Sequence, residues 1–202
     1  MIRERYIGKG VHPLVVGLSR FILRLCGWRI EGQIPAGPKY VLVAAPHTSG
    51  WDFFLWLALT YACRSRCVWM GKDSLFRPPF GVVFTWLGGI PIDRDSRNGV
   101  VGQAIETFGS VSEMVLAIPP EGTRKKTDHW KSGFYYIAQG AGVPLVLSFV
   151  DFERKAMGYG PMLIPNGDIE ADMAVIREFY KDVKAKYPEN FSDVRLRSLE
   201  KL

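Results

Sequence analysis

The chain has 202 residues, 48% of them apolar, and its 26 Lys and Arg against 20 Asp and Glu give a net charge of +6. This length fits one domain with enough apolar residues for a hydrophobic core, and the composition excludes intrinsic disorder. Collagen-like and repeat architectures are also excluded, because the sequence has no internal period. Three cysteines and three histidines without paired spacing predict no disulfide framework and no metal site, and fit a reducing compartment.

The positive charge is concentrated at the N-terminus. Residues 1–30 contain six basic residues and a single acidic one, Glu4, which gives a net charge of +5. The basic residues are Arg3, Arg5, Lys9, Arg20, Arg24 and Arg29. Apolar residues within residues 11–28 follow helical spacing and predict an amphipathic helix; they are Leu14, Val15, Leu18, Phe21, Ile22 and Leu25. Arginines inside this segment, and the lack of a small-x-small cleavage motif, argue against a signal peptide.

Two interpretations of this helix remain open: it docks on the core of the protein, or it lies in the interface of an anionic bilayer. No apolar stretch of the chain is free enough of Gly, Pro and charge to predict a spanning helix. We therefore predict a basic, amphipathic, membrane-associating segment at residues 1–30, followed by one domain at residues 31–202.

Strand and helix patterns then alternate along the chain. Short apolar or extended runs predict strands at 40–45, 67–70, 89–93, 115–118 and 144–150. Helical patterns follow at 49–62, 73–76, 79–88, 99–112, 134–139 and 171–186, the third of them expected to be buried, and a hairpin or loop is expected at 158–165. This alternation predicts an α/β fold with a mixed, largely parallel sheet flanked by helices.

His47 and Asp52 form the first chemical candidate. His47 follows the first predicted strand, and Ser49 and Asp52 have the spacing of a capping box that opens the next helix. A histidine and a carboxylate facing each other across this turn could work as a general base and its orienting partner. The spacing alone also fits a simple helix cap with an ordinary turn histidine.

Charged residues at later loops form the second candidate. Glu121, Gly122, Thr123 and Arg124 follow a predicted buried strand, in a loop that also holds Lys125, Lys126 and Lys131. Glycine allows close backbone approach and the cations suit a phosphate, although a solvated charged loop has the same composition. Lys72 and Arg94 are further cations at predicted loops. Signatures of nucleotide-binding loops, serine hydrolases and zinc hydrolases are absent from the sequence.

These blocks occur in an informative order: H-x4-D at 47–52, Lys72, G-I-P-I-D-R at 89–94, E-G-T-R at 121–124, and V-P-L-V at 143–146. In this order and spacing, residues 40–150 resemble the glycerolipid acyltransferase superfamily, the PlsC-like lysophosphatidate and glycerophosphate acyltransferases. Pro91, Pro119-Pro120 and Leu147 depart from the usual family pattern, which leaves the identity of the acceptor open.

The resemblance implies roles for individual residues. His47 is similar to the catalytic base of the family and Asp52 to its partner. Arg94 resembles a ligand of the acceptor phosphate, and Glu121, Gly122, Thr123 and Arg124 match a block associated with acceptor binding. Lys72 is assigned to substrate binding with them.

The resemblance implies an O-acyltransferase without a cofactor, which moves a fatty acyl group from acyl-CoA or an acyl carrier protein to a lysophospholipid acceptor, 1-acylglycerol 3-phosphate foremost. We expect peripheral or monotopic association with the cytoplasmic side of an anionic membrane. Another lipid or polyol acceptor, and a noncatalytic protein that binds anionic lipid, remain alternatives. Nucleic-acid binding is disfavoured, because the Lys and Arg residues are concentrated in an apolar helix rather than on a face with stacking aromatic residues.

Overall fold

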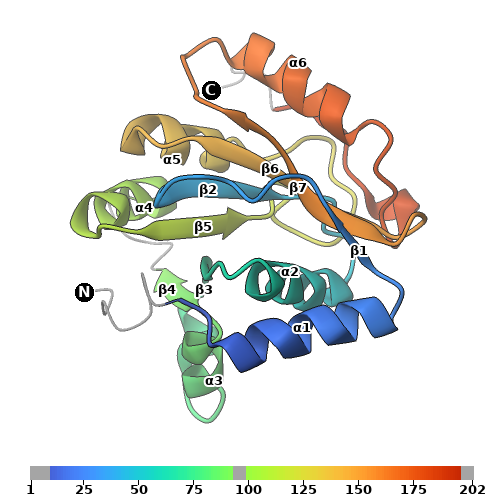
Figure 1. Ribbon diagram of the computed structural model, residues 1–202. Coiled ribbons are helices and arrows are strands. Elements are labelled where there is room, and N and C mark those ends of the chain that lie inside the picture. The colour runs from blue at the N-terminus through green and yellow to red at the C-terminus, as the bar shows by residue number, and fades with distance from the viewer. Residues whose placement is uncertain (1–9, 93–98, 197–202) are drawn as a thin grey trace.

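The α/β fold is confirmed in a computed structural model, which describes residues 10–92 and 99–196 (Figure 1). Within these ranges, seven strands form one sheet in the order β1-β7-β6-β2-β5-β3-β4. All neighbouring strands are parallel except β6 and β7, which are antiparallel. The sheet is therefore mixed and largely parallel, as predicted.

The strands are β1 (Arg29–Glu31), β2 (Lys39–Ala44), β3 (Cys67–Lys72), β4 (Gly89–Ile92), β5 (Met114–Ile118), β6 (Leu145–Asp151) and β7 (Ala156–Leu163). The α-helices are α1 (Pro13–Leu25), α2 (Gly50–Ala62), α3 (Gly81–Trp86), α4 (Gly99–Ser110), α5 (Gly133–Ala141) and α6 (Ile169–Tyr180). Two short 3₁₀ helices, η2 (Asp73–Phe76) and η3 (Pro188–Asn190), complete these elements.

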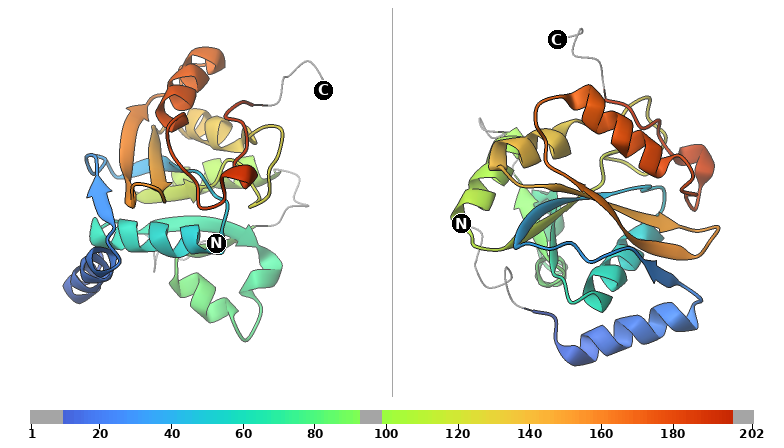
Figure 2. Two further views of the ribbon diagram at one scale, coloured as in Figure 1. Left: turned by 90° about the vertical axis from the view of Figure 1, so that its right-hand side faces the viewer. Right: turned by 45° about the horizontal axis from the view of Figure 1, so that its top comes forward.

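The central strand β2 is covered on both faces, which explains its uninterrupted apolar sequence. Its side chains alternate between two hydrophobic clusters: Val41 and Val43 contribute to one, and Leu42 and Ala44 to the other. Helices α4, α5 and α6 cover the first face and α2 covers the second (Figures 1 and 2). The carboxyl end of β2 therefore meets the start of α2 at one edge of the sheet.

The N-terminal helix α1 lies on the outer side of α2 (Figure 1). It contacts the protein through Val16, Ser19 and Leu23, which are buried, and Arg20 Nε donates a 2.8 Å hydrogen bond to the Ala62 carbonyl. The apolar stripe found in the sequence faces away from this contact: Leu14, Val15, Leu18, Phe21, Ile22 and Leu25 are all exposed. The helix thus docks on the protein, as one of the two interpretations expected, but through Val16, Ser19 and Leu23 rather than through the predicted apolar stripe.

Three other local predictions also differ from the structure. Helix α3 is not buried, because Val82, Val83 and Trp86 are exposed. The segment at 158–165 belongs mostly to strand β7, which pairs with β6 and with the unpredicted strand β1. Helix α6 ends at Tyr180 rather than at residue 186, because the following segment turns back and Phe152 N–H donates to the Lys184 carbonyl.

Within residues 10–92 and 99–196, no helix is both long and apolar enough to cross a membrane.

Candidate active site

The turn between β2 and α2, residues 45–49, is organised by the carboxylate of Asp52. This side chain is fully buried, and its Oδ2 accepts hydrogen bonds of 2.7 Å from the backbone N–H groups of Thr48 and Ser49. Oδ1 accepts a third, of 2.7 Å, from the Ser49 hydroxyl. The predicted capping box is present. Three donors in the turn therefore fix both the carboxylate and the backbone that carries His47.

His47 lies against this carboxylate. Its Nδ1 is 3.5 Å from Asp52 Oδ2, and its side chain is 20% exposed. The separation exceeds a good hydrogen bond, and Nδ1 has no hydrogen-bond partner among the described residues. Such contacts are often long in the absence of substrate. With Nδ1 directed at Asp52, Nε2 lies on the far side of the ring and is available to accept a proton.

Glu121 approaches the same turn from the loop after β5. It is 1% exposed, and its Oε2 accepts a 2.7 Å hydrogen bond from the backbone N–H of His47. Burial raises the pKa of Glu121 to about 8, the charge of nearby Asp52 adds to the increase, and the bond from His47 opposes it. Glu121 thus lies beneath the turn and supports the backbone of His47, a placement that sequence spacing did not predict.

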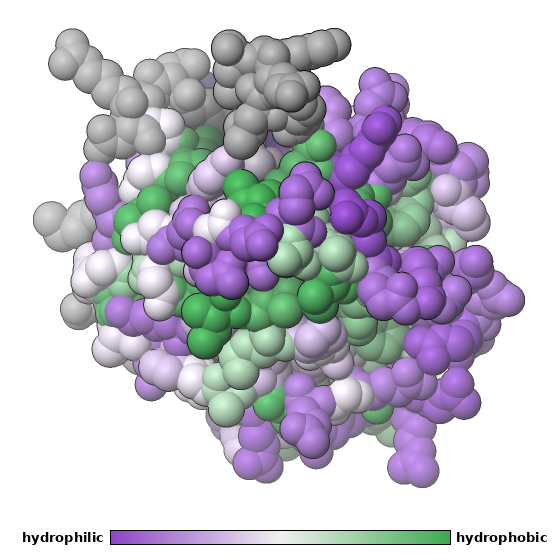
Figure 3. Space-filling view, turned by 90° about the horizontal axis from the view of Figure 1, so that it is seen from above, coloured by the Kyte–Doolittle hydropathy of each residue, from purple (hydrophilic) through white to green (hydrophobic). Residues whose placement is uncertain are grey.

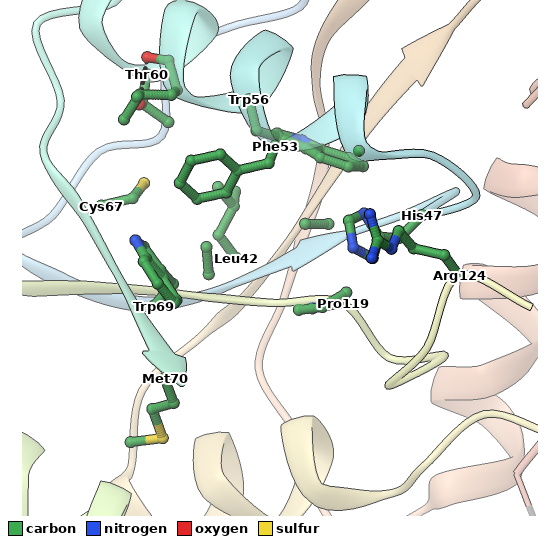
Figure 4. A pocket seen from close by; sticks show the side chains of 14 residues that line it. Leu42, His47, Phe53, Trp56, Thr60, Cys67, Trp69, Met70, Pro119 and Arg124 are labelled. Atoms are coloured by element: carbon green, nitrogen blue, oxygen red, sulfur yellow. Dashed lines mark hydrogen bonds between the residues drawn. The ribbon is translucent and has the colours of Figure 1, made fainter. Parts of the chain in front are cut away.

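An apolar pocket of about 340 Å³ opens beside His47 (Figure 4). Its walls come from α2, β2, β3 and the start of the loop after β5, and include Leu42, Phe53, Trp56, Leu57, Trp69, Met70 and Pro119. His47 and Arg124 lie at one end, whereas Thr60 and Cys67 lie toward the other (Figure 4). The pocket therefore combines an apolar interior with a proton acceptor and a cation at one end, which suits a long apolar chain with a polar head.

Two tryptophans of this wall are fixed by hydrogen bonds and were not singled out from the sequence. Trp56 Nε1 donates to Ser148 Oγ at 2.9 Å, and Trp69 Nε1 donates to the Leu87 carbonyl at 3.1 Å. Phe53 packs edge-on against Trp69, with ring centroids 5.5 Å apart. Their spacing on a helix and a strand is also that of ordinary core residues, so only the assembled structure reveals the pocket.

The other predicted site residues are only partly brought together. Arg124 is exposed and lines the pocket with His47. Gly122 adopts a φ of +67°, a left-handed conformation that favours glycine at this position of the loop. Thr123 is half-buried, and its Oγ1 accepts a hydrogen bond from Lys125 N–H at 3.3 Å.

Lys72 does not line the pocket. It is exposed at the end of β3, two places from β2 in the sheet. Arg94 lies outside the described residues.

The sequence also matches a known family. The model of the Acyltransferase family aligns with residues 28–147, more than half of the chain. The chain belongs to this family. The match runs from just before β1 to the first residues of β6, and so includes the β2–α2 turn, the pocket and the Glu121–Arg124 loop.

Two known proteins, one similar in sequence and one in fold, give further comparisons. A 1-acyl-sn-glycerol-3-phosphate acyltransferase from Haemophilus influenzae is 29% identical over 131 residues, covering 60% of this chain and 53% of that protein. The match thus extends over about half the length of that relative. The crystal structure of the 1-acyl-sn-glycerophosphate acyltransferase PlsC from Thermotoga maritima matches with a TM-score of 0.57 at 19% identity, covering 86% of this chain and 80% of that one. This second likeness concerns the fold.

Proposed function

We propose that the protein transfers a fatty acyl group from an acyl thioester to a hydroxyl of a lysophospholipid-like acceptor, with 1-acylglycerol 3-phosphate as the first acceptor to test. The observation that carries this proposal is the position of His47, held between Asp52 and Glu121 at the end of an apolar pocket. Membership of the Acyltransferase family and the likeness to the Haemophilus influenzae enzyme support the same reaction.

In the proposed mechanism, His47 Nε2 takes the proton from the acceptor hydroxyl while its Nδ1–H faces Asp52. The hydroxyl oxygen attacks the thioester carbonyl, the carbon–sulfur bond breaks, and the thiolate leaves with the proton returned by His47. The oxyanion formed on the way would be stabilised by Arg124 or by backbone N–H groups near Gly50, both of which border the pocket. No acyl-enzyme and no metal or other cofactor takes part.

The apolar pocket is assigned to the acyl chain of the donor. Its wall is built from aromatic and aliphatic side chains, so a hydrocarbon chain would lose contact with water as it enters. The acyl carbonyl would then remain beside His47, at the end where Arg124 also lies (Figure 4). The reacting groups would be brought together by this placement. Both acyl-CoA and an acyl carrier protein can present such a chain.

We also propose that the protein works at the surface of an anionic membrane, on its cytoplasmic side. The exposed stripe of α1 supports this, together with Arg24 in the last turn of that helix. Exposed apolar residues of α3 lie on the same side of the sheet as α1 (Figure 1). The face over α5 and α6 is mixed: hydrophilic side chains gather on the right and along the margins of the view, and apolar side chains lie across its middle (Figure 3).

A substrate panel tests this function. The purified protein is incubated with labelled acyl-CoA or acyl carrier protein and a series of lysolipids, and products are identified by mass together with release of the free thiol. We expect one thiol released for each acyl group transferred to a hydroxyl. Binding to lipid vesicles without product from any acceptor would instead favour the noncatalytic lipid-binding protein.

A further inference from the structure

Residues 181–196, which follow α6, form a mostly irregular strap that crosses the carboxyl edge of the sheet beside the loop after β5 (Figure 2, left). The strap lies outside the part of the chain matched by the family model, which ends at residue 147. Half-buried apolar side chains fix it on the first hydrophobic cluster; they are Val183, Phe191, Val194 and Leu196. Its backbone groups are therefore left to bond with other segments at this edge.

The strap forms hydrogen bonds with three loops that leave the sheet at the same edge. Between β6 and β7, the Phe152 N–H donates to the Lys184 carbonyl at 2.9 Å. At the β2–α2 turn, Thr48 Oγ1 accepts a 3.3 Å bond from the Tyr187 N–H, and Thr48 is next to His47. The third loop follows β5 and is held by more of these bonds than the other two loops.

Residues 127–130 of that loop run alongside the strap. The Trp130 N–H donates to the Arg195 carbonyl at 2.7 Å, and Arg195 Nε donates to the Asp128 carbonyl at 2.8 Å. Trp130 also pairs with Leu196 in an isolated parallel bridge. These are backbone attachments that many side chains would allow.

Ser192 attaches the same loop through its side chain, which is buried. Its Oγ accepts a 2.9 Å hydrogen bond from the Thr127 N–H and lies 2.9 Å from Thr127 Oγ1. Because the Thr127 hydroxyl donates to the His129 carbonyl at 3.0 Å, the proton between the two hydroxyls is that of Ser192. Ser192 thus makes two hydrogen bonds to Thr127, and alanine in its place would leave the Thr127 N–H without its acceptor.

The loop held in this way also carries residues of the proposed reaction centre. Glu121 supports the backbone of His47, and Arg124 lines the apolar pocket. The two ends of the loop are joined, because the Lys131 N–H donates to the Pro120 carbonyl at 2.8 Å. In a loop closed at its base, the attachment of Thr127 restricts where Arg124, three residues earlier, can lie.

We propose that the strap holds the loop after β5 in its reactive position, and that Ser192 is a positioning residue for acyl transfer. The inference rests on the proposed function, because the reaction positioned is the one assigned to His47. Ser192 acts through Thr127 and does not itself line the apolar pocket. The walls of that pocket come mainly from α2, β2 and β3, so loss of the Ser192 bonds should disturb the chemical step more than binding of the acyl chain.

Steady-state kinetics of Ser192→Ala test this split. With 1-acylglycerol 3-phosphate as acceptor, we expect kcat to fall about tenfold, while the KM for the acyl donor changes by less than about twofold. Ser192→Thr keeps the hydroxyl and should restore most of kcat. A fall of kcat that threonine does not restore, or an unchanged kcat in Ser192→Ala, would overturn the inference.

Thr107→Val is the matched control for loss of a buried hydroxyl. Thr107 is buried in α4, near the end that leads to the start of β5, and its Oγ1 donates to the Gln103 carbonyl at 2.7 Å. Both variants should lower the melting temperature by a similar amount, but only Ser192→Ala should lower kcat. Equal kcat values for the two variants would show that the effect is one of general stability and would overturn the inference.

Hydrogen–deuterium exchange follows the loop without turnover. Peptides that cover residues 121–131 should exchange about fivefold faster in Ser192→Ala than in the native protein, and peptides from α4 should not change. Faster exchange of the loop in a protein that transfers no acyl group would support the attachment by the strap while refuting the proposed function. Acyl transfer by the native protein, with kcat and loop exchange unchanged in Ser192→Ala, would refute the role of the strap alone.

Discussion

Removal of the exposed apolar stripe of α1 should weaken binding to vesicles strongly. Leu18 is 59% exposed and Phe21 is 63% exposed. Complete burial of such a side chain contributes about 1.5–3 kcal/mol, so insertion of the exposed parts contributes about 1–2 kcal/mol each. The double variant Leu18→Ser/Phe21→Ser should therefore lower the vesicle partition coefficient by about 30-fold to several hundred-fold.

The assay is co-sedimentation with anionic vesicles, and thermal melting checks that the fold is retained. Little change in melting temperature is expected, because α1 is held on α2 by Val16, Leu23 and the Arg20 hydrogen bond rather than by the stripe. The control is Ile164→Ser/Val175→Ser, which removes exposed apolar residues from the α6 region. Equal vesicle binding by the two double variants would refute the assignment of α1 to the membrane.

Three further predictions concern charge. Arg24→Gln should weaken binding to anionic vesicles about fivefold at low salt and leave binding to neutral vesicles unchanged in the same assay, because one surface cation contributes about 1 kcal/mol. Asp52→Asn should lower kcat by roughly 10²-fold with a small effect on KM, because an amide cannot hold the Nδ1 proton of His47 as a carboxylate does; an unchanged kcat would contradict the orienting role. The pKa of Glu121 is raised from an ordinary 4.5 to about 8, so the folded state binds the carboxyl proton of Glu121 more tightly than the unfolded state does. The stabilisation of the fold by this proton is therefore complete below about pH 4.5 and is lost as the pH rises to 8. Denaturant titrations at pH 5 and pH 8 should show a larger loss of stability for the native protein than for Glu121→Gln, and parallel losses would contradict the account.

The parts of the site predicted from sequence are those set by local chemistry. The capping box of Ser49 and Asp52 involves residues three apart, and the strand before it is a short apolar run, so both can be read along the chain. Because these two elements meet at the β2–α2 turn, the pairing of His47 with Asp52 follows from them. The family resemblance then supplied the roles of these residues.

The rest depends on contacts between distant segments. Strand β7 contains Gly158, Gly160 and Pro161, which are poor strand formers, and it exists because β6 and β1 pair with its two edges. A Cβ on Gly158 would lie 1.9 Å from the carbonyl oxygen of Glu31, so glycine here permits the approach of β1.

The contact of Glu121 with His47 likewise joins residues 74 apart, and no periodic pattern predicts it. Helix α3 has the composition of a buried helix, yet the structure leaves it largely exposed. The composition of α3 specifies that the helix is apolar, but only the tertiary arrangement decides whether other parts of the protein cover its apolar side chains or leave them exposed.

The most direct test of the account is acyl transfer by the His47→Ala variant. The purified variant and the native protein are compared with a labelled acyl thioester and 1-acylglycerol 3-phosphate in vesicles, and the diacyl product is measured by mass. We predict that transfer by the variant falls by at least about 10²-fold, while vesicle binding and melting temperature stay unchanged. A variant that retains most of the native activity would contradict the assignment of His47 as the base.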